Sequence, residues 1–179
     1  MTACTIIQTE PYLVYEIDLE KLNAAVDISA IVKDFDTVSY VYTFRFQGKI
    51  IKHGISTDQK SIPGERIYRQ SGHLLGWRQQ LAIGSAGDDM RDINSRYCRK
   101  TGENLNRIGM KITVHDLTKL QSPSITDKNL HVKQLERQLI REYKEKHGEL
   151  PIGNIKDESH IDNKTCVTKS TWERLFEFE

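Results

Sequence analysis

The sequence predicts an α+β fold in which a small sheet is flanked by helices, and three segments carry that prediction. Residues 39–55 predict a β-hairpin, because β-branched and aromatic residues fill two short runs on either side of Gln47-Gly48. Residues 111–117 alternate between apolar and polar side chains and predict a third strand. Residues 124–147 carry an apolar stripe at helical spacing.

The composition limits what the protein can be. With 179 residues, of which 37% are apolar and 28% charged, the chain is long enough for one domain with a sizeable core. A net charge of +1 excludes a global polycation, so any nucleic-acid-binding surface has to be local. The three cysteines are far apart and match no zinc spacing, and neither a signal peptide nor a membrane span is recognisable. We therefore expect a reduced, cytoplasmic protein with no membrane partner.

Extensions are expected on both sides of the core. Residues 1–38 are predicted to form an N-terminal extension with a short strand at 12–17 and a helix capped by Asp18. Residues 155–179 are polar and are predicted to form a C-terminal extension that packs on the core through a last short helix. The core itself is predicted to span residues 39–154.

The hairpin carries two polar residues in an otherwise apolar strand. Lys52 and His53 lie on the strand that returns past Tyr42. Because side chains alternate between faces, a turn with an odd number of residues would place Lys52 on the face of Tyr42, whereas an even turn would place His53 there. A solvent-exposed lysine on a half-buried strand is the plainest alternative.

A helix predicted from Pro63 to Gly76 brings three basic side chains together. Arg66, Arg69 and His73 are spaced three and four residues apart, so they can share one helix face. Taken alone, this pattern is typical of a solvated surface, although a guanidinium can also bind a phosphate in bidentate fashion.

A second helix is predicted from about residue 89 to residue 99. The acidic residues at its start complement the positive end of the helix dipole better than they fit a metal site. Arg96, Arg99 and Lys100 follow at its other end. They complement the negative end of the dipole and could also contact phosphates.

The long helix of residues 124–147 carries a carboxylate in an unusual place. Glu136 lies four residues from both Val132 and Ile140, at the edge of the apolar stripe. Burying an unpaired carboxylate is costly, so we expect a cation, a metal ion or hydrogen-bond donors beside it. A turn from Pro151 to Asn154 follows the helix.

Taken in order, these pieces resemble the GIY-YIG nuclease family over residues 39–154. Tyr40-Val41-Tyr42 stands where the family has Gly-Ile-Tyr, and Lys52-His53-Gly54 stands where it has Tyr-Ile-Gly. The arginine helix, the third strand, the glutamate helix and a Pro-x-x-Asn turn follow as in the family. Only Gly54 of the two named glycines is retained, and Lys52 replaces a tyrosine, as in some restriction enzymes of the family. The resemblance implies a small central antiparallel three-stranded sheet flanked by helices.

The resemblance also implies roles for the candidate catalytic residues. Glu136 would hold a single Mg²⁺ or Mn²⁺, which prefers oxygen ligands. Arg69, or Arg66 in its place, would bind the scissile phosphate. Tyr42 would act as general base or position the attacking water, assisted by Lys52, which could also be the base itself.

The remaining candidates are assigned to positioning and substrate binding. His73 would hold the nucleophile or a phosphate oxygen, and Asn154 would orient its neighbours. The motif alignment selects Lys52 as the companion of Tyr42, with His53 as the alternative. The candidates for substrate binding are His53, Asn154, Arg96, Arg99 and Lys100.

These features predict a stand-alone, metal-dependent endonuclease, a hydrolase of double-stranded DNA of the restriction or phage type. An enzyme of this kind that cuts both strands would act as a homodimer. The altered motifs leave open a nucleic-acid-binding module that keeps the scaffold without cutting. The low net charge leaves open a third possibility, a scaffold that binds a protein partner.

Overall fold

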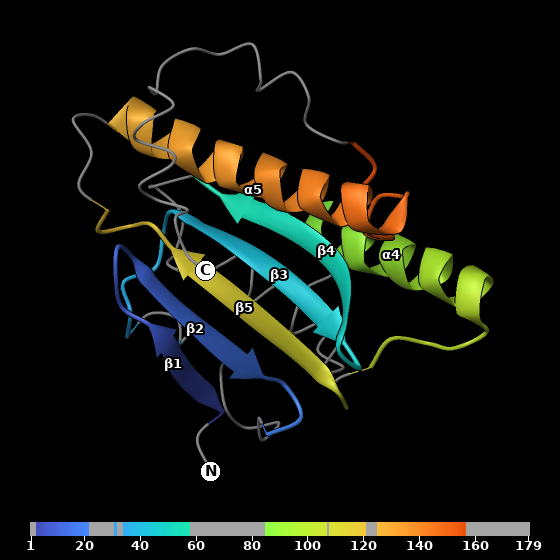
Figure 1. Cartoon of the computed structure of the whole chain (residues 1–179). Coiled ribbons are helices and arrows are strands. Elements are labelled where there is room, and N and C mark those ends of the chain that lie inside the picture. Colours follow the sequence, from blue (N-terminus) through green and yellow to red (C-terminus); the bar gives the residue numbers. More distant parts are fainter. Residues whose placement is uncertain are drawn as a thin grey trace.

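The computed structural model describes residues 3–21, 31, 34–57, 85–106, 108–120 and 125–156, which form the α+β architecture of Figure 1. The elements defined in these ranges are β1 (Cys4–Gln8), β2 (Leu13–Asp18), β3 (Tyr40–Phe46), β4 (Lys49–Ser56), α4 (Ser85–Thr101), β5 (Met110–Asp116) and α5 (Ile125–His147). Within them, no helix is both long and apolar enough to cross a membrane.

The strands form one antiparallel sheet in the order β1-β2-β5-β3-β4. The predicted hairpin and third strand are β3, β4 and β5, with β3 in the middle. The prediction of only three strands was wrong, because β1 and β2 of the N-terminal extension join the sheet. β2 pairs with β5 along its whole length, from Leu13↔Asp116 to Asp18↔Lys111, and covers backbone groups that a three-stranded sheet would leave at an open edge.

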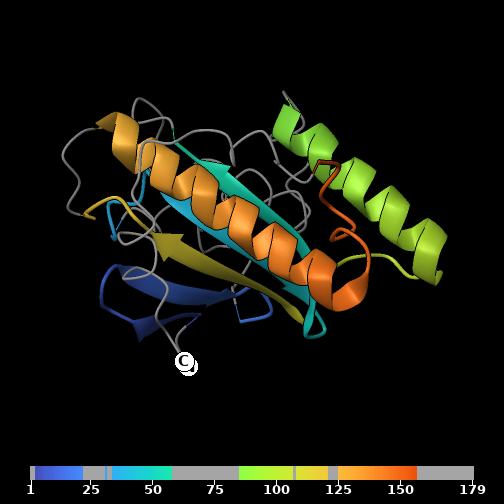
Figure 2. The same cartoon turned by 45° about the horizontal axis from the view of Figure 1, so that its top comes forward.

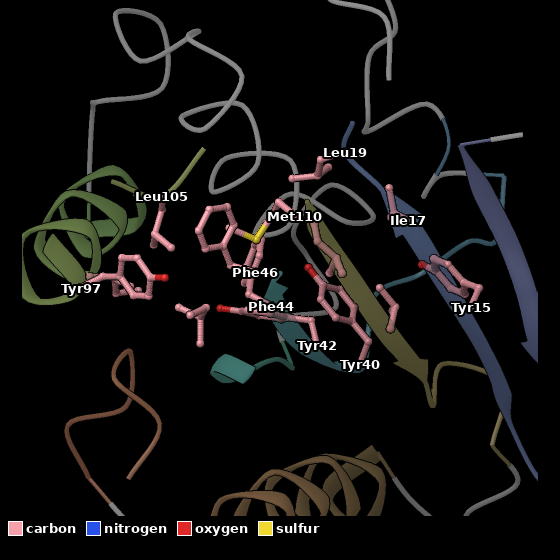
Figure 3. Close-up of a cluster of buried hydrophobic side chains, with 14 residues drawn as sticks. Tyr15, Ile17, Leu19, Tyr40, Tyr42, Phe44, Phe46, Tyr97, Leu105 and Met110 are labelled. Atoms are coloured by element: carbon pink, nitrogen blue, oxygen red, sulfur yellow. The ribbon is translucent and has the colours of Figure 1, made fainter. Parts of the chain in front are cut away.

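One face of the sheet carries a row of aromatic side chains from β3. Tyr40, Tyr42, Phe44 and Phe46 are all buried, together with residues of β2 and β5 (Figure 3). α4 packs on this face, where the ring of Tyr97 meets Phe46 edge to face with centroids 5.6 Å apart. We call this side of the sheet the tyrosine face.

The other face is covered by α5, which lies across β4 and β3 (Figure 2). Val132 and Leu135 of the helix pack against Val14 and Val41 of the sheet, as the helical periodicity predicted. We call this side the helix face.

A buried polar network fixes the start of β3. Thr37 donates a hydrogen bond of 2.9 Å to the carboxylate of Asp116 at the end of β5. The hydroxyl of Thr118 accepts hydrogen bonds from the backbone N–H groups of Val38 at 2.9 Å and Ser39 at 3.0 Å. Burial raises the pKa of Asp116, and its hydrogen bonds to Thr118 and Thr37 counteract that rise. β3 therefore enters the sheet with its register fixed beside β5.

Several predicted segments lie outside the described residues. They are the helix of residues 63–76, most of the helix expected after Asp18, and the C-terminal extension beyond residue 156. The helix expected from about residue 89 to residue 99 is present and longer, since α4 runs from Ser85 to Thr101.

Candidate active site

The hairpin turn has the even length that would place His53 beside Tyr42. It consists of Gln47 and Gly48, and both have a positive φ, 49° and 79°, as a tight two-residue hairpin turn requires. If regular pairing continued from this turn, His53 would lie opposite Tyr42.

A β-bulge reverses this outcome. Arg45 pairs with Ile50, but the adjacent Phe44 pairs with Lys52, which leaves Ile51 as an extra residue in β4. Ile51 turns into the apolar cluster of the tyrosine face, where it is 2% exposed. Every residue of β4 beyond the bulge is therefore shifted by one position, and so by one face.

The shift places Lys52 on the tyrosine face. Tyr42 pairs with Gly54, and paired residues of antiparallel strands share a face, so Lys52 lies two residues along the face of Tyr42. The ring of Tyr42 lies over Gly54, where a Cβ atom would overlap its Cζ and hydroxyl oxygen. A larger residue at position 54 would therefore displace the ring of Tyr42.

His53 lies on the helix face, away from Tyr42. Its Nδ1 is 2.8 Å from the hydroxyl of Thr43, its cross-strand partner. Burial, reinforced by Arg45 and His115, lowers the pKa of His53 to about 3. The buried imidazole is neutral near pH 7, so it offers no positive charge to a phosphate.

The Pro-x-x-Asn turn binds the edge of β4 that pairs with no other described strand, which we call the free edge. The side chain of Asn154 accepts a hydrogen bond from the N–H of His53 and donates one to its carbonyl, both at 2.9 Å. The N–H of Gly153 donates to the carbonyl of Ile51 at 2.8 Å, and a Cβ at Gly153 would lie only 2.6 Å from the Cβ of Lys52. The turn therefore holds the backbone around the bulge, whereas the role predicted for Asn154 in catalysis stays a prediction.

Glu136 lies in the buried stripe of α5, with 9% of its surface exposed. The adjacent Leu135 packs in the cluster of the helix face, and α5 contacts β4, the edge strand that carries Lys52. Since Tyr42 and Lys52 belong to the opposite face, a site that includes Glu136 has to form around the free edge of β4.

A buried carboxylate suits a hard divalent cation that keeps several water ligands. Across the described part of the chain, no three His, Cys, Asp or Glu side chains gather into a metal site. The predicted site needs only the one carboxylate of Glu136 from the protein. Arg66, Arg69 and His73, the predicted phosphate ligands, lie outside the described residues, and their position stays a prediction.

The cations at the end of α4 line a shallow groove together with the closing turn. The segment after α5 runs beside α4 (Figure 2), and the groove between them has a volume of about 630 Å³. Its lining residues are Arg96, Arg99, Lys100, Glu149, Leu150, Pro151, Ile152 and Asn154. Lys100 forms an ion pair with Glu149, whereas Arg96 pairs with Asp92 of its own helix at 3.0 Å.

The sequence reasoning missed a polar row on the helix face. Arg45 donates a hydrogen bond to the hydroxyl of Thr113, and His115 Nδ1 lies 3.5 Å from the hydroxyl of Tyr12. Burial, and after it the charge of Arg45, lowers the pKa of His115 to about 4. The sequence contained a signal for this row, since polar residues stand at alternate positions of β3 and of β5 and so share one face of the sheet.

No family model, curated protein or solved structure matches this chain. Its function has to be argued from the motifs and from the geometry that they adopt. That geometry combines a tyrosine and a lysine on one face with a buried carboxylate on the helix that contacts the edge strand. Such groups can serve phosphodiester hydrolysis, which needs an activated water, a Lewis acid and positive charge at the phosphate.

Proposed function

We propose that this protein is a metal-dependent endonuclease that hydrolyses double-stranded DNA. The observation that carries the proposal is the bulge at Ile51, which sets Lys52 on the face of Tyr42 while Gly54 leaves room for the tyrosine ring. A bulge sacrifices regular strand pairing, and bulges are over-represented beside active sites, where they re-aim a side chain.

In this proposal, Tyr42 acts as the general base toward the water that attacks the phosphorus, and Lys52 acts beside it as a cation. Lys52 is half-buried beside the closing turn, so its charge is held in place before negative charge develops on the phosphate. Glu136 would hold one Mg²⁺ or Mn²⁺ at the free edge of β4. When bound, the ion supplies Lewis-acid stabilisation of the phosphate oxygens. Arg66 or Arg69 would bind the same phosphate.

Lys52 stands where the motif that it resembles has a tyrosine, as in some restriction enzymes of the GIY-YIG family, and this favours a restriction or phage-type enzyme. A homodimer would place one active site on each strand of a duplex, and we propose this arrangement for the enzyme.

One observation favours a second candidate, a nucleic-acid-binding module without nuclease activity. The helix of Glu136 packs on the face opposite Tyr42, so the carboxylate joins the site only if it closes around the edge of β4. In the second candidate, the carboxylate of Glu136 does not join the site, and the scaffold binds DNA without cutting it.

Cleavage of a mixed-sequence DNA duplex tests the proposal and separates the two candidates. The wild type is compared with Glu136→Gln and Tyr42→Phe in Mg²⁺, Mn²⁺ or EDTA. We expect discrete fragments with either metal, none in EDTA, and a loss of about 100-fold or more in rate for each variant. A folded wild type that shifts DNA on a gel but cuts none with either metal would overturn the nuclease in favour of the binding module.

A further inference from the structure

We infer that the groove between α4 and the closing turn binds the sugar–phosphate backbone of double-stranded DNA, which deepens the proposed function and rests on it. One wall of the groove is a row of three cations of α4, Arg96, Arg99 and Lys100. Arg99 and Lys100 lie three and four residues after Arg96, so both are its neighbours on the helix surface. Among the lining residues that the structure describes, Glu149 is the one carboxylate. A local basic row in a chain of net charge +1 is the electrostatic pattern expected of a phosphate-binding surface.

Two cations of this row, Lys100 and Arg99, are exposed and can bind phosphates. The ion pair of Lys100 with Glu149 joins side chains that are 54% and 57% exposed. Such an exposed pair contributes little stability, so a phosphate can replace the carboxylate of Glu149. Arg99 is exposed and donates its Nε–H to the carbonyl of Ser95 at 3.3 Å, which uses one of the five N–H donors of a guanidinium.

The groove leads directly to the proposed reaction face. Asn154 lines the groove, and its side chain holds the backbone of His53 in β4. The preceding residue, Gly153, lies against Lys52. A DNA strand whose phosphates follow the groove would therefore arrive beside Lys52 on the tyrosine face, and phosphate contacts of this kind position a substrate without reading its sequence.

A simpler explanation of the row is that cations stabilise the negative end of any helix dipole. The chain contains a control for this explanation, because α5 also ends in basic residues, among them Lys146. Lys146 is exposed and is not part of the groove lining. If the cations of α4 served only the helix dipole, neutralising Lys100 would affect DNA binding no more than neutralising Lys146.

The experiment measures binding of a labelled duplex in EDTA, where no cleavage occurs, across a series of salt concentrations. The wild type is compared with Arg99→Gln, Lys100→Gln, Glu149→Gln and the control Lys146→Gln, all at exposed positions so that folding is preserved. Arg99→Gln and Lys100→Gln should each weaken binding roughly threefold to tenfold and reduce the magnitude of the negative salt slope, d log K/d log[salt], by about 1. Glu149→Gln removes the competing carboxylate and should tighten binding by about twofold to fivefold. Lys146→Gln should change neither quantity.

The inference would be overturned if Arg99→Gln and Lys100→Gln kept the affinity and salt slope of the wild type. It would also be overturned if Lys146→Gln weakened binding as much as they do. A wild type that does not bind DNA would overturn it as well. The proposed nuclease is read separately, by adding Mg²⁺ to the same samples. Binding that depends on the groove, without cleavage by the wild type, would contradict the nuclease and leave the groove assignment standing. Cleavage by the wild type, together with unchanged DNA binding by the groove variants, would support the nuclease and contradict the groove assignment.

Discussion

The two faces of the β3–β4 hairpin give the adjacent residues Lys52 and His53 different environments. On the tyrosine face, Lys52 is half-buried on the same face as Tyr42 and is held by the closing turn. On the helix face, His53 is buried and neutral, and it is paired with Thr43. A single extra residue, Ile51, separates these outcomes, since regular pairing from the turn would exchange the two positions. One bulge can therefore decide which of two adjacent side chains is available for chemistry.

Gly54→Ala should disrupt the tyrosine face most strongly. The added methyl group overlaps the ring of Tyr42, so the ring has to move. We expect a loss of about 1–3 kcal/mol in the free energy of unfolding, measured in urea, and loss of detectable DNA cleavage.

A double-variant cycle sharpens this prediction. In Tyr42→Ala/Gly54→Ala the ring is gone and the methyl group has space. The double variant should therefore lose less stability than the sum of the two single variants. Strictly additive losses would show that Gly54 does not press against the ring.

The helix face should make the protein sensitive to acid. His53 and His115 have pKa values of about 3 and about 4 in the folded protein, whereas both take up protons below about pH 6.5 once the chain unfolds. Stability should therefore be complete above about pH 6.5 and fall toward pH 4, by about 1.4 kcal/mol per pH unit for each histidine. Urea unfolding at a series of pH values measures this slope.

Two variants assign the slope to its residues. His53→Gln should remove the share of His53 and flatten the pH dependence. His147→Gln, at an exposed position at the end of α5, should leave the slope unchanged. A wild-type slope in His53→Gln would mean that the imidazole is not held neutral between sheet and helix.

Asn154→Ala should weaken the attachment of the closing turn to the edge strand β4. It removes two hydrogen bonds to the backbone of His53, and we expect a loss of about 1–3 kcal/mol in unfolding free energy. Cleavage should slow by roughly tenfold because Lys52 loses its support. Asn154→Asp keeps the acceptor but loses the donor, so its effects should be intermediate. Reduced stability with wild-type cleavage would limit the turn to a purely structural role.

Local patterns in the sequence predicted the elements that carry the site. The β-branched and aromatic runs around Gln47-Gly48 and the stripe of residues 124–147 are properties of short segments, and the structure has strands and a helix there. The stripe also placed Glu136 at a buried position, where it is 9% exposed. Such predictions succeed because burial of one face is encoded in the spacing of apolar residues.

Two features depended on packing that the pattern does not encode. Ile50 and Ile51 are adjacent and equally apolar, so either could turn toward the tyrosine face, and the bulge is invisible in the sequence. The pairing of β2 with β5 is set by the need to cover an open strand edge, whereas the segment alone predicts only a strand. Both features concern how elements pair. Among the elements themselves, the sequence did not predict β1 (Cys4–Gln8).

Single-turnover cleavage of a DNA duplex by Lys52→Gln and His53→Gln tests most directly whether the tyrosine face is the reaction face. Both changes remove a titratable group from adjacent positions of one strand, and both products can still form hydrogen bonds. We predict that Lys52→Gln slows cleavage by about 100-fold or more at wild-type stability, whereas His53→Gln stays within a few-fold of the wild-type rate. Loss of cleavage in His53→Gln with normal activity in Lys52→Gln would contradict this assignment and place the chemistry on the helix face.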